Sequence, residues 1–210
     1  NAIAGGNGSS PISGIYWSND YGVSWTFTTL GFNVTRLCMN GQYCIASTNG
    51  SGLYYSNDYG HSWTVSNINS DVYSWCAMSG TYCVAIKNSI PTTNNGIVYS
   101  SDYGQTWIQV ITDDIRPTMC SMYLNYAIVV ENTNGYIYTS SDYGLTWGRV
   151  QYDSGTIRFT STTLSASPEY TVSAIVAGGR GIYYNTSTLC YDISTVVLCM
   201  VDNNEKYVKI

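Results

Sequence analysis

The octapeptide SNDYGVSW at residues 18–25 returns three more times along the chain, and this repetition determines the expected fold class. The other copies read SNDYGHSW at 56–63, SSDYGQTW at 100–107 and SSDYGLTW at 140–147. All four share a first Ser, an Asp, a Tyr, a Gly, a hydroxyl residue and a closing Trp. Their aspartates, Asp20, Asp58, Asp102 and Asp142, lie 38, 44 and 40 residues apart. A period near 40 residues indicates an array of similar supersecondary units.

Short apolar runs flank every copy of this octapeptide, which we call the box. GIYW, GLYY, GIVY and YIYT precede the four boxes and TFTTL, TVSNI, IQVIT and GRVQY follow them, so each box joins two predicted strands. Upstream, RLCMNGQYCIA and WCAMSGTYCVAI predict another strand pair, with two-residue hairpin turns at Asn40-Gly41 and Ser79-Gly80, because Gly accepts a positive φ. Each repeat is therefore predicted to be four antiparallel strands, with apolar residues on both faces, as in a β-propeller blade.

A degraded fifth repeat and the two ends of the sequence predict the number of blades. GIYYNTSTLCYD from Gly181 matches GIYWSNDYGVSW from Gly14, although Ser187 stands at the Asp position and no Trp follows. Reading residues 207–210 (YVKI) into 1–6 (NAIAGG) reproduces the register of YTVSAIVAGG from Tyr170. We therefore predict one all-β domain over 1–210, a five-bladed β-propeller closed by pairing of the N- and C-terminal segments. The expected blades are approximately 195–210 plus 1–30, 31–68, 69–112, 115–152 and 154–194.

The composition argues against several classes of partner. Charged residues make up 10% of the chain, the net charge is −5 and no run of Lys or Arg occurs, so a nucleic-acid partner is not expected. No apolar stretch approaches the roughly 18 residues of a membrane-spanning helix, so membrane insertion is not expected either. With His61 as the one histidine and no clustered acids, we expect no metal and no cofactor.

The pattern S-x-D-x-G-x-[ST]-W resembles the Asp-box, or bacterial neuraminidase repeat, of β-propellers in the sialidase and sortilin-like superfamily. The resemblance implies that the box lies on the hairpin between the third and fourth strands of a blade, opposite the usual binding face. Physically, the Asp can accept backbone N–H groups, the Gly can adopt a left-handed conformation and the Trp can pack between blades. We therefore expect structural roles for Ser18, Asp20, Gly22, Trp25, Ser56, Asp58, Gly60, Trp63, Ser100, Asp102, Gly104, Trp107, Ser140, Asp142, Gly144 and Trp147.

Candidate ligand-binding residues lie near the loops of the opposite face. Arg36, Arg116 and Arg158 stand near the starts of predicted first strands, and Arg180 lies in a loop between a second and a third strand. Arginine would bind anionic groups, Trp75 would stack on a ligand, and the acids Asp114 and Glu131 would bind hydroxyls. The alternatives are surface solubility for the arginines and a core-filling role for Trp75.

These observations favour a non-catalytic binding module for a glycan or a protein surface, because the loops on that face are rich in Asn, Gly, Ser and Thr. Two alternatives stay open: a sialidase-like or other glycoside hydrolase, and a purely structural ring in a larger assembly. No catalytic residue is assigned, since no pair of carboxyl groups suited to glycoside hydrolysis can be placed. Low charge with abundant Tyr, Asn, Ser and Thr is typical of an extracellular, cell-surface or virion-surface location.

Seven cysteines lie in or beside predicted strands: Cys38, Cys44, Cys76, Cys83, Cys120, Cys190 and Cys199. We expect most of them to be small buried residues with free thiols. Counting outward from the Ser79-Gly80 turn places Cys76 opposite Cys83, and Cys190 with Cys199 is a candidate disulfide.

Overall fold

The computed structural model describes residues 1–6, 14–88, 95–112, 115–131, 136–151, 158–166, 171–178, 181–187, 199–201 and 207–209, with side chains described as far as Arg149. All regular structure in these ranges is β-strand, as predicted. The chain forms two compact units, Asn1–Ile115 and Arg116–Ile210.

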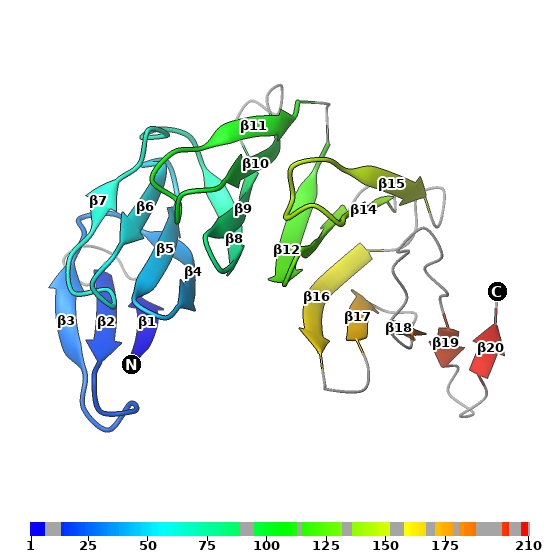
Figure 1. Ribbon diagram of the computed structural model, residues 1–210, viewed down its shortest axis with the longest axis horizontal. Coiled ribbons are helices and arrows are strands. Elements are labelled where there is room, and N and C mark those ends of the chain that lie inside the picture. The colour runs from blue at the N-terminus through cyan, green and yellow to red at the C-terminus, as the bar shows by residue number, and fades with distance from the viewer. Residues whose placement is uncertain are drawn as a thin grey trace. The chain divides into compact units, whose positions relative to one another are not determined.

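The first unit contains three antiparallel sheets whose strands follow one another in chain order (Figure 1). The first sheet has three strands, β1 (Ala2–Gly6), β2 (Gly14–Ser18) and β3 (Thr26–Thr29). The second has four, β4 (Val34–Asn40), β5 (Tyr43–Thr48), β6 (Leu53–Ser56) and β7 (Thr64–Val65). The third also has four, β8 (Tyr73–Ser79), β9 (Tyr82–Lys87), β10 (Gly96–Ser100) and β11 (Ile108–Ile111).

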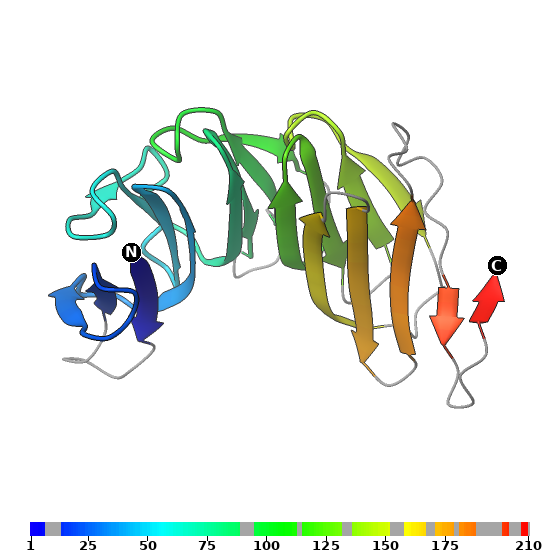
Figure 2. The ribbon, with the colours of Figure 1, turned by 60° about the horizontal axis from the view of Figure 1, so that its bottom comes forward.

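The second unit contains two sheets (Figure 2). A four-stranded sheet consists of β12 (Pro117–Tyr123), β13 (Tyr126–Glu131), β14 (Tyr136–Ser140) and β15 (Gly148–Gln151). A five-stranded sheet consists of β16 (Arg158–Ala166), β17 (Thr171–Gly178), β18 (Gly181–Ser187), β19 (Cys199–Val201) and β20 (Tyr207–Lys209). The four-stranded antiparallel repeat is thus confirmed in three sheets.

The terminal strands belong to different sheets among the described pairings. β1 pairs with β2, and β20 pairs with β19. The expected pairing of the N- and C-terminal segments is not among these pairs, so ring closure and the number of blades stay predictions.

The core of the first unit lies between successive sheets. Second strands are buried on both faces: five consecutive residues of β5, Cys44–Thr48, are buried, and so are five of β9. Ile45 and Leu53 of the second sheet pack with Cys76, Val98 and Trp107 of the third. This two-sided burial explains why these strands read as continuous apolar runs rather than as strict alternation.

The hairpins between first and second strands turn one residue later than predicted. Asn40 pairs with Tyr43 and Ser79 with Tyr82, so Asn40 and Ser79 end their strands and the loops begin at Gly41 and Gly80. Both glycines have positive φ, 61° and 60°, as expected for Gly at the first central position of a type II′ turn.

This shift also corrects the expected cysteine pairing. Cys76 lies opposite Ala85, and Cys83 lies opposite Met78. The predicted register treats Gly80 as the second residue of the loop, whereas Gly80 is the first. The whole loop therefore lies one residue later in the chain than predicted.

Candidate functional site

Each box forms the turn between the last two strands of its sheet, β2 and β3 for the first box, and its shared residues hydrogen-bond to one another. In the third box, Ser100 Oγ donates to Asp102 Oδ1 at 2.8 Å, and Thr106 donates its N–H to Oδ1 at 2.9 Å and its hydroxyl to Oδ2 at 2.6 Å. The Gly104 N–H donates to Ser100 Oγ at 2.9 Å, and the Trp107 indole N–H donates to the Gly104 carbonyl at 2.8 Å. The other three boxes repeat all of these bonds.

The box carboxylates are held in their charged form by this network. The side-chain and backbone hydrogen bonds from Ser24 lower the pKa of Asp20 to about 2. Burial opposes the effect at Asp102, but the hydrogen bonds from Thr106 and Ser100 outweigh it and lower the pKa of that carboxyl. Each of these carboxylates accepts hydrogen bonds from residues of its own box.

Box hairpins also bond to the first hairpin of the same sheet, except in the first sheet. The N–H groups of Tyr59, Tyr103 and Tyr143 donate to the carbonyls of Gln42, Thr81 and Asn125 at 2.9, 2.9 and 2.7 Å. In the described part of the chain the first sheet has three strands and no such hairpin, and the equivalent Tyr21 is 94% exposed.

Packing of the boxes between sheets differs along the first unit. A Cβ on Gly104 would collide with Ile45 of the preceding sheet, and one on Gly60 would collide with Ile3, whereas one on Gly22 would meet only Trp25 of its own box. Correspondingly, Trp107 is 3% exposed and Trp25 is 44% exposed. The second box therefore contacts β1 and the third box contacts β5, each in the preceding sheet.

Arg36 and Trp75, two of the predicted binding residues, lie together. The Arg36 guanidinium carbon is 4.0 Å from the centre of the Trp75 ring. Arg36 is exposed and Trp75 is half-buried, so the indole supports a guanidinium that faces solvent. Arg36 also donates from Nη1 to the Thr35 carbonyl at 2.8 Å, which orients the planar group.

A local irregularity of the strands sets the positions of both residues. The register shifts between Val34 and Arg36 in β4 and between Tyr73 and Trp75 in β8, as at a β-bulge. Bulges change the direction of a side chain next to a strand end. Thr35 occupies the first irregularity and donates from Oγ1 to the Tyr73 carbonyl at 2.6 Å, which joins β4 to β8.

Glu131 and Arg116 also meet, but through the backbone. Glu131 is 1% exposed, and its Oε1 accepts the Arg116 N–H at 3.1 Å. The Arg116 side chain is exposed. Glu131 thus supports the start of β12, and its expected contact with a ligand hydroxyl stays a prediction.

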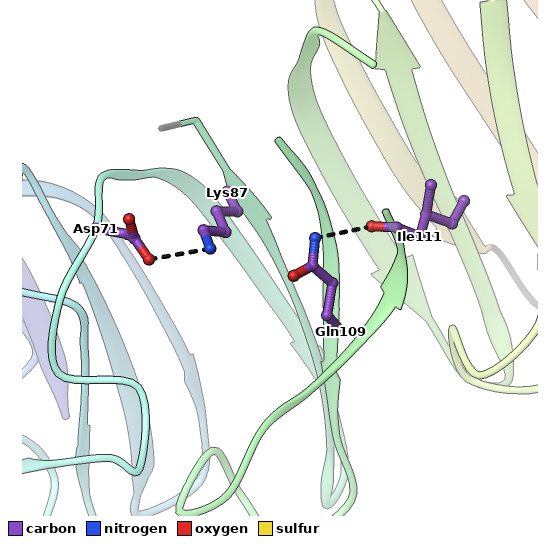
Figure 3. Close-up of polar contacts among 4 residues, drawn as sticks. All are labelled: Asp71, Lys87, Gln109 and Ile111. Carbon is purple, nitrogen blue, oxygen red and sulfur yellow. Dashed lines mark hydrogen bonds and ion pairs between the residues drawn. The ribbon is translucent and has the colours of Figure 1, made fainter. Parts of the chain in front are cut away.

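In the third sheet, an ion pair that the sequence did not predict lies at the register position that Glu131 holds on β13 (Figure 3). Lys87, at the end of β9, is 7% exposed, and its Nζ lies 3.0 Å from Asp71 Oδ2 on the segment before β8. Nearby, Gln109 Nε2 donates to the Ile111 carbonyl at 3.2 Å. Lys87 and Glu131 hold equivalent register positions, opposite Tyr73 and Pro117.

The remaining candidates are not placed. Asp114 and Arg180 lie outside the described residues, and Arg158 begins β16 without a described side chain. Arg36 and Trp75 belong to the first unit, and Arg116 and Glu131 to the second. The grouping of all seven residues around one axis therefore stays a prediction.

Within the ranges that the structure describes, no three His, Cys, Asp or Glu side chains come together as metal ligands. The described part also contains no helix long and apolar enough to cross a membrane. The His61 ring contacts the Trp17 ring at a tilt of 36°, with ring centres 3.8 Å apart.

Comparison with known proteins assigns the fold type. No protein-family model matches the sequence. No curated protein matches it either. Among solved structures, the GH74 enzyme of Niastella koreensis matches with a TM-score of 0.63 and 18% identity, over 91% of this chain and 29% of the enzyme. YCF48 bound to a D1 peptide matches with a TM-score of 0.52 and 17% identity, over 80% of this chain and 57% of YCF48.

A chain of the nidogen–laminin complex matches with a TM-score of 0.62 and 8% identity, over 85% of this chain and 71% of that one. The GH74 and YCF48 structures are β-propellers, so the chain has a fold of the β-propeller type, built from four-stranded antiparallel sheets. It spans 28% of the length of an ancestral GH74 enzyme. These neighbours include enzymes as well as a protein with a bound peptide. The fold alone therefore does not distinguish catalysis from binding.

Proposed function

We propose that this chain is a non-catalytic β-propeller module that binds a carboxylate-bearing glycan through a site containing Arg36 and Trp75. The observation that carries the proposal is the exposed Arg36 guanidinium held 4.0 Å above the Trp75 ring. A planar guanidinium can bind a carboxylate with two parallel hydrogen bonds, and an indole can stack on a sugar ring. The stacked arrangement orients the donors before a ligand arrives, which lowers the entropic cost of binding.

The carboxylates of the described part support a non-catalytic role. Glycoside hydrolysis needs two carboxyl groups that face the substrate, one as acid and one as base or nucleophile. The six acids with described side chains each have a partner in their own surroundings: Asp20, Asp58, Asp102 and Asp142 in the boxes, Asp71 with Lys87, and Glu131 with the Arg116 N–H. Hydrolysis of xyloglucan or of a sialylated substrate by the purified chain would contradict the proposal.

A glycan array followed by titration of the bound sugar tests the site. Glycans with sialic or uronic acids should bind, and Arg36→Ala should weaken their affinity at least about tenfold, the loss expected for one charge-assisted contact. Arg149→Ala is a matched control, because Arg149 also lies over an aromatic ring, Tyr136 at 5.1 Å, but on β15. Equal losses in the two variants, or equally tight binding of neutral glycans, would refute the site.

A protein ligand is the second candidate, because the neighbours include YCF48 with a bound peptide and a chain of the nidogen–laminin complex. A silent glycan array together with Arg36-dependent binding of a protein partner would favour it. Either ligand suits a location outside cells or on a virion surface, and a structural ring in a larger assembly stays the third possibility.

We also propose that the chain is an Asp-box propeller of five blades whose boxes are structural parts. The internal hydrogen bonds of the four boxes and the burial of Trp107 support this role. Among the described residues, the first sheet has three strands rather than four. Tyr21 and Trp25 of its box are more exposed than the equivalent Tyr and Trp of the other three boxes. A strand beside β1 would complete this sheet.

In the proposed ring, the segment 195–210 pairs with β1 and supplies that strand. This pairing would replace the pairing of β19 with β18. Fluorescence energy transfer between dyes at the two chain ends tests this closure. High transfer that disappears in denaturant is expected, and low transfer in the folded chain would exclude a closed five-bladed ring.

A further inference from the structure

Two cysteines from different sheets meet where β4 and β8 lie side by side. Cys38 Sγ on β4 is 3.5 Å from Cys76 Sγ on β8, although the residues are 38 positions apart in the chain. Both are thiols, and both lie in the first unit. Cys76 is 4% exposed, whereas Cys38 is only partly buried and is the more accessible residue of the two.

The neighbouring contacts hold the two strands in this arrangement. Thr35 Oγ1 donates to the Tyr73 carbonyl at 2.6 Å, and Arg36 stacks on Trp75, so β4 and β8 are joined on one side of the sulfur pair. A disulfide has an S–S length near 2.0 Å, so the two sulfurs need to approach by about 1.5 Å.

The other described thiols of this unit are poorly suited to the same reaction. Cys44 and Cys83 are fully buried, and their Sγ atoms lie 3.9 Å from the Gln42 and Thr81 carbonyls. Burial raises the pKa of Cys44 to about 12 and also raises the pKa of Cys83, so their reactive thiolates are scarce near neutral pH. The positions equivalent to Cys38 in β8 and β12 are Ala77 and Ser121, so the repeat itself does not require a thiol there.

We propose that Cys38 and Cys76 form a disulfide-forming site that joins two neighbouring sheets when a small disulfide such as oxidised glutathione is present. The Cys38 thiolate attacks one sulfur of the small disulfide and releases a thiolate, which leaves a mixed disulfide on Cys38. The Cys76 thiolate then attacks the Cys38 sulfur and releases the second small thiol. Two protein thiols are oxidised, one small disulfide is reduced to two thiols, and the two protons pass to the released thiolates.

This link would restrain the strands that carry Arg36 and Trp75. Cys38 follows Arg36 by two residues on β4, and Cys76 directly follows Trp75 on β8. The cross-link closes a loop of 38 residues, which restricts the unfolded chain and stabilises the folded one. The inference does not depend on the proposed ligand, because the chemistry is read from the thiols alone.

The test is oxidation of the folded chain with oxidised glutathione, alkylation of the remaining thiols and digestion with chymotrypsin without reduction. Trypsin is unsuitable, since no Lys or Arg lies between residues 37 and 86, whereas Tyr43, Tyr54, Tyr73 and Tyr82 separate the four cysteines of this region. The expected product is a peptide containing Cys38 joined to one containing Cys76. Links from Cys38 to Cys44 or from Cys76 to Cys83, or a glutathione adduct that persists on Cys38, would overturn the proposal.

Variants separate this pair from general thiol reactivity. Cys38→Ala should abolish the cross-link, and Cys44→Ala should keep it. Oxidation should raise the Tm of the wild type by several degrees, reversibly with dithiothreitol, and should leave the Tm of Cys38→Ala unchanged. If Cys44→Ala does not fold, the peptide map of the wild type decides alone. A Tm rise of equal size in Cys38→Ala would refute the link.

Discussion

Removal of the Trp107 indole is the sharpest test of the box as a structural part. Trp107 is 3% exposed, and it packs with Ile45 and Leu53 of the preceding sheet. Its indole N–H donates to the Gly104 carbonyl at 2.8 Å. Its backbone N–H and carbonyl bond to the side chain of Asn67, at 2.8 and 3.1 Å, and these two bonds survive a change of side chain.

The magnitude follows from what the substitution Trp107→Ala removes. Truncation of a buried Trp to Ala costs about 3–5 kcal/mol, because apolar contacts are lost and a cavity is left. The loss of the hydrogen bond to Gly104 is included in that range. For a chain of this length, 1 kcal/mol lowers Tm by roughly 2–4 °C, so a fall of roughly 6–20 °C is expected.

Calorimetry or thermal unfolding followed by circular dichroism measures the effect. Trp107→Phe is the matched control, since it keeps most of the apolar contact, loses the indole N–H and should cost about 1–2 kcal/mol. A Tm within about 2 °C of the wild type for Trp107→Ala would refute the structural role. A fall in Tm for Trp107→Phe equal to that for Trp107→Ala would show that the hydrogen bond, and not the packing, dominates.

Four further measurements test the other inferences. Trp25→Ala should cost about 2 kcal/mol if Trp25 stays 44% exposed in solution, and about 4 kcal/mol if ring closure covers it, so its unfolding free energy measures closure independently of the chain ends. Asp58→Ala should lower Tm, because it leaves the Ser62 N–H and hydroxyl without their acceptor; a stable Asp58→Ala variant that had lost ligand binding would falsify the structural role of this box. Because the folded pKa of Asp102 is lowered, its stabilising contribution is complete above the unfolded pKa of about 3.9 and is lost as the pH falls through the folded value; urea unfolding below pH 4 should therefore show a smaller loss of stability in Asp102→Asn than in the wild type. Substitution of Arg36 and Arg158 together should leave the chain folded and abolish binding of anionic ligands; binding that is retained would exclude a site at the first strands.

The strand architecture was largely predictable because the same sequence pattern occurs four times in the chain. The Asp, Gly and Trp shared by the four boxes predict the same turn in every copy. The strands before and after that turn could therefore be placed. The turn register was wrong by one residue, because a Gly in a two-residue loop fits either of two places. Only the backbone conformation shows that Gly41 and Gly80 come first.

The sequence indicates individual candidate residues for the site, which stay predictions, but not the contacts between them. The proximity of Arg36 to Trp75 depends on the irregularities before each residue, and no turn signal marks a bulge inside a strand. The ion pair of Lys87 with Asp71 was not predicted either, because a lysine at a strand end is ordinarily exposed to solvent. The hydrogen bond from the Arg116 N–H to Glu131 was not predictable either, because the two residues lie 15 positions apart in the sequence.

Variation among the repeats of this one chain separates scaffold from recognition. Positions equivalent by register should carry similar residues where they serve the fold and different residues where they serve one site. The box repeats its Ser, Asp and Trp in all four copies. The third position of the first strand, by contrast, is Arg36 in β4, Trp75 in β8 and Met119 in β12, each next to the same register shift. Since the backbone geometry is shared and the side chains are not, the fold does not dictate these residues, and they are where a specific ligand contact is best sought.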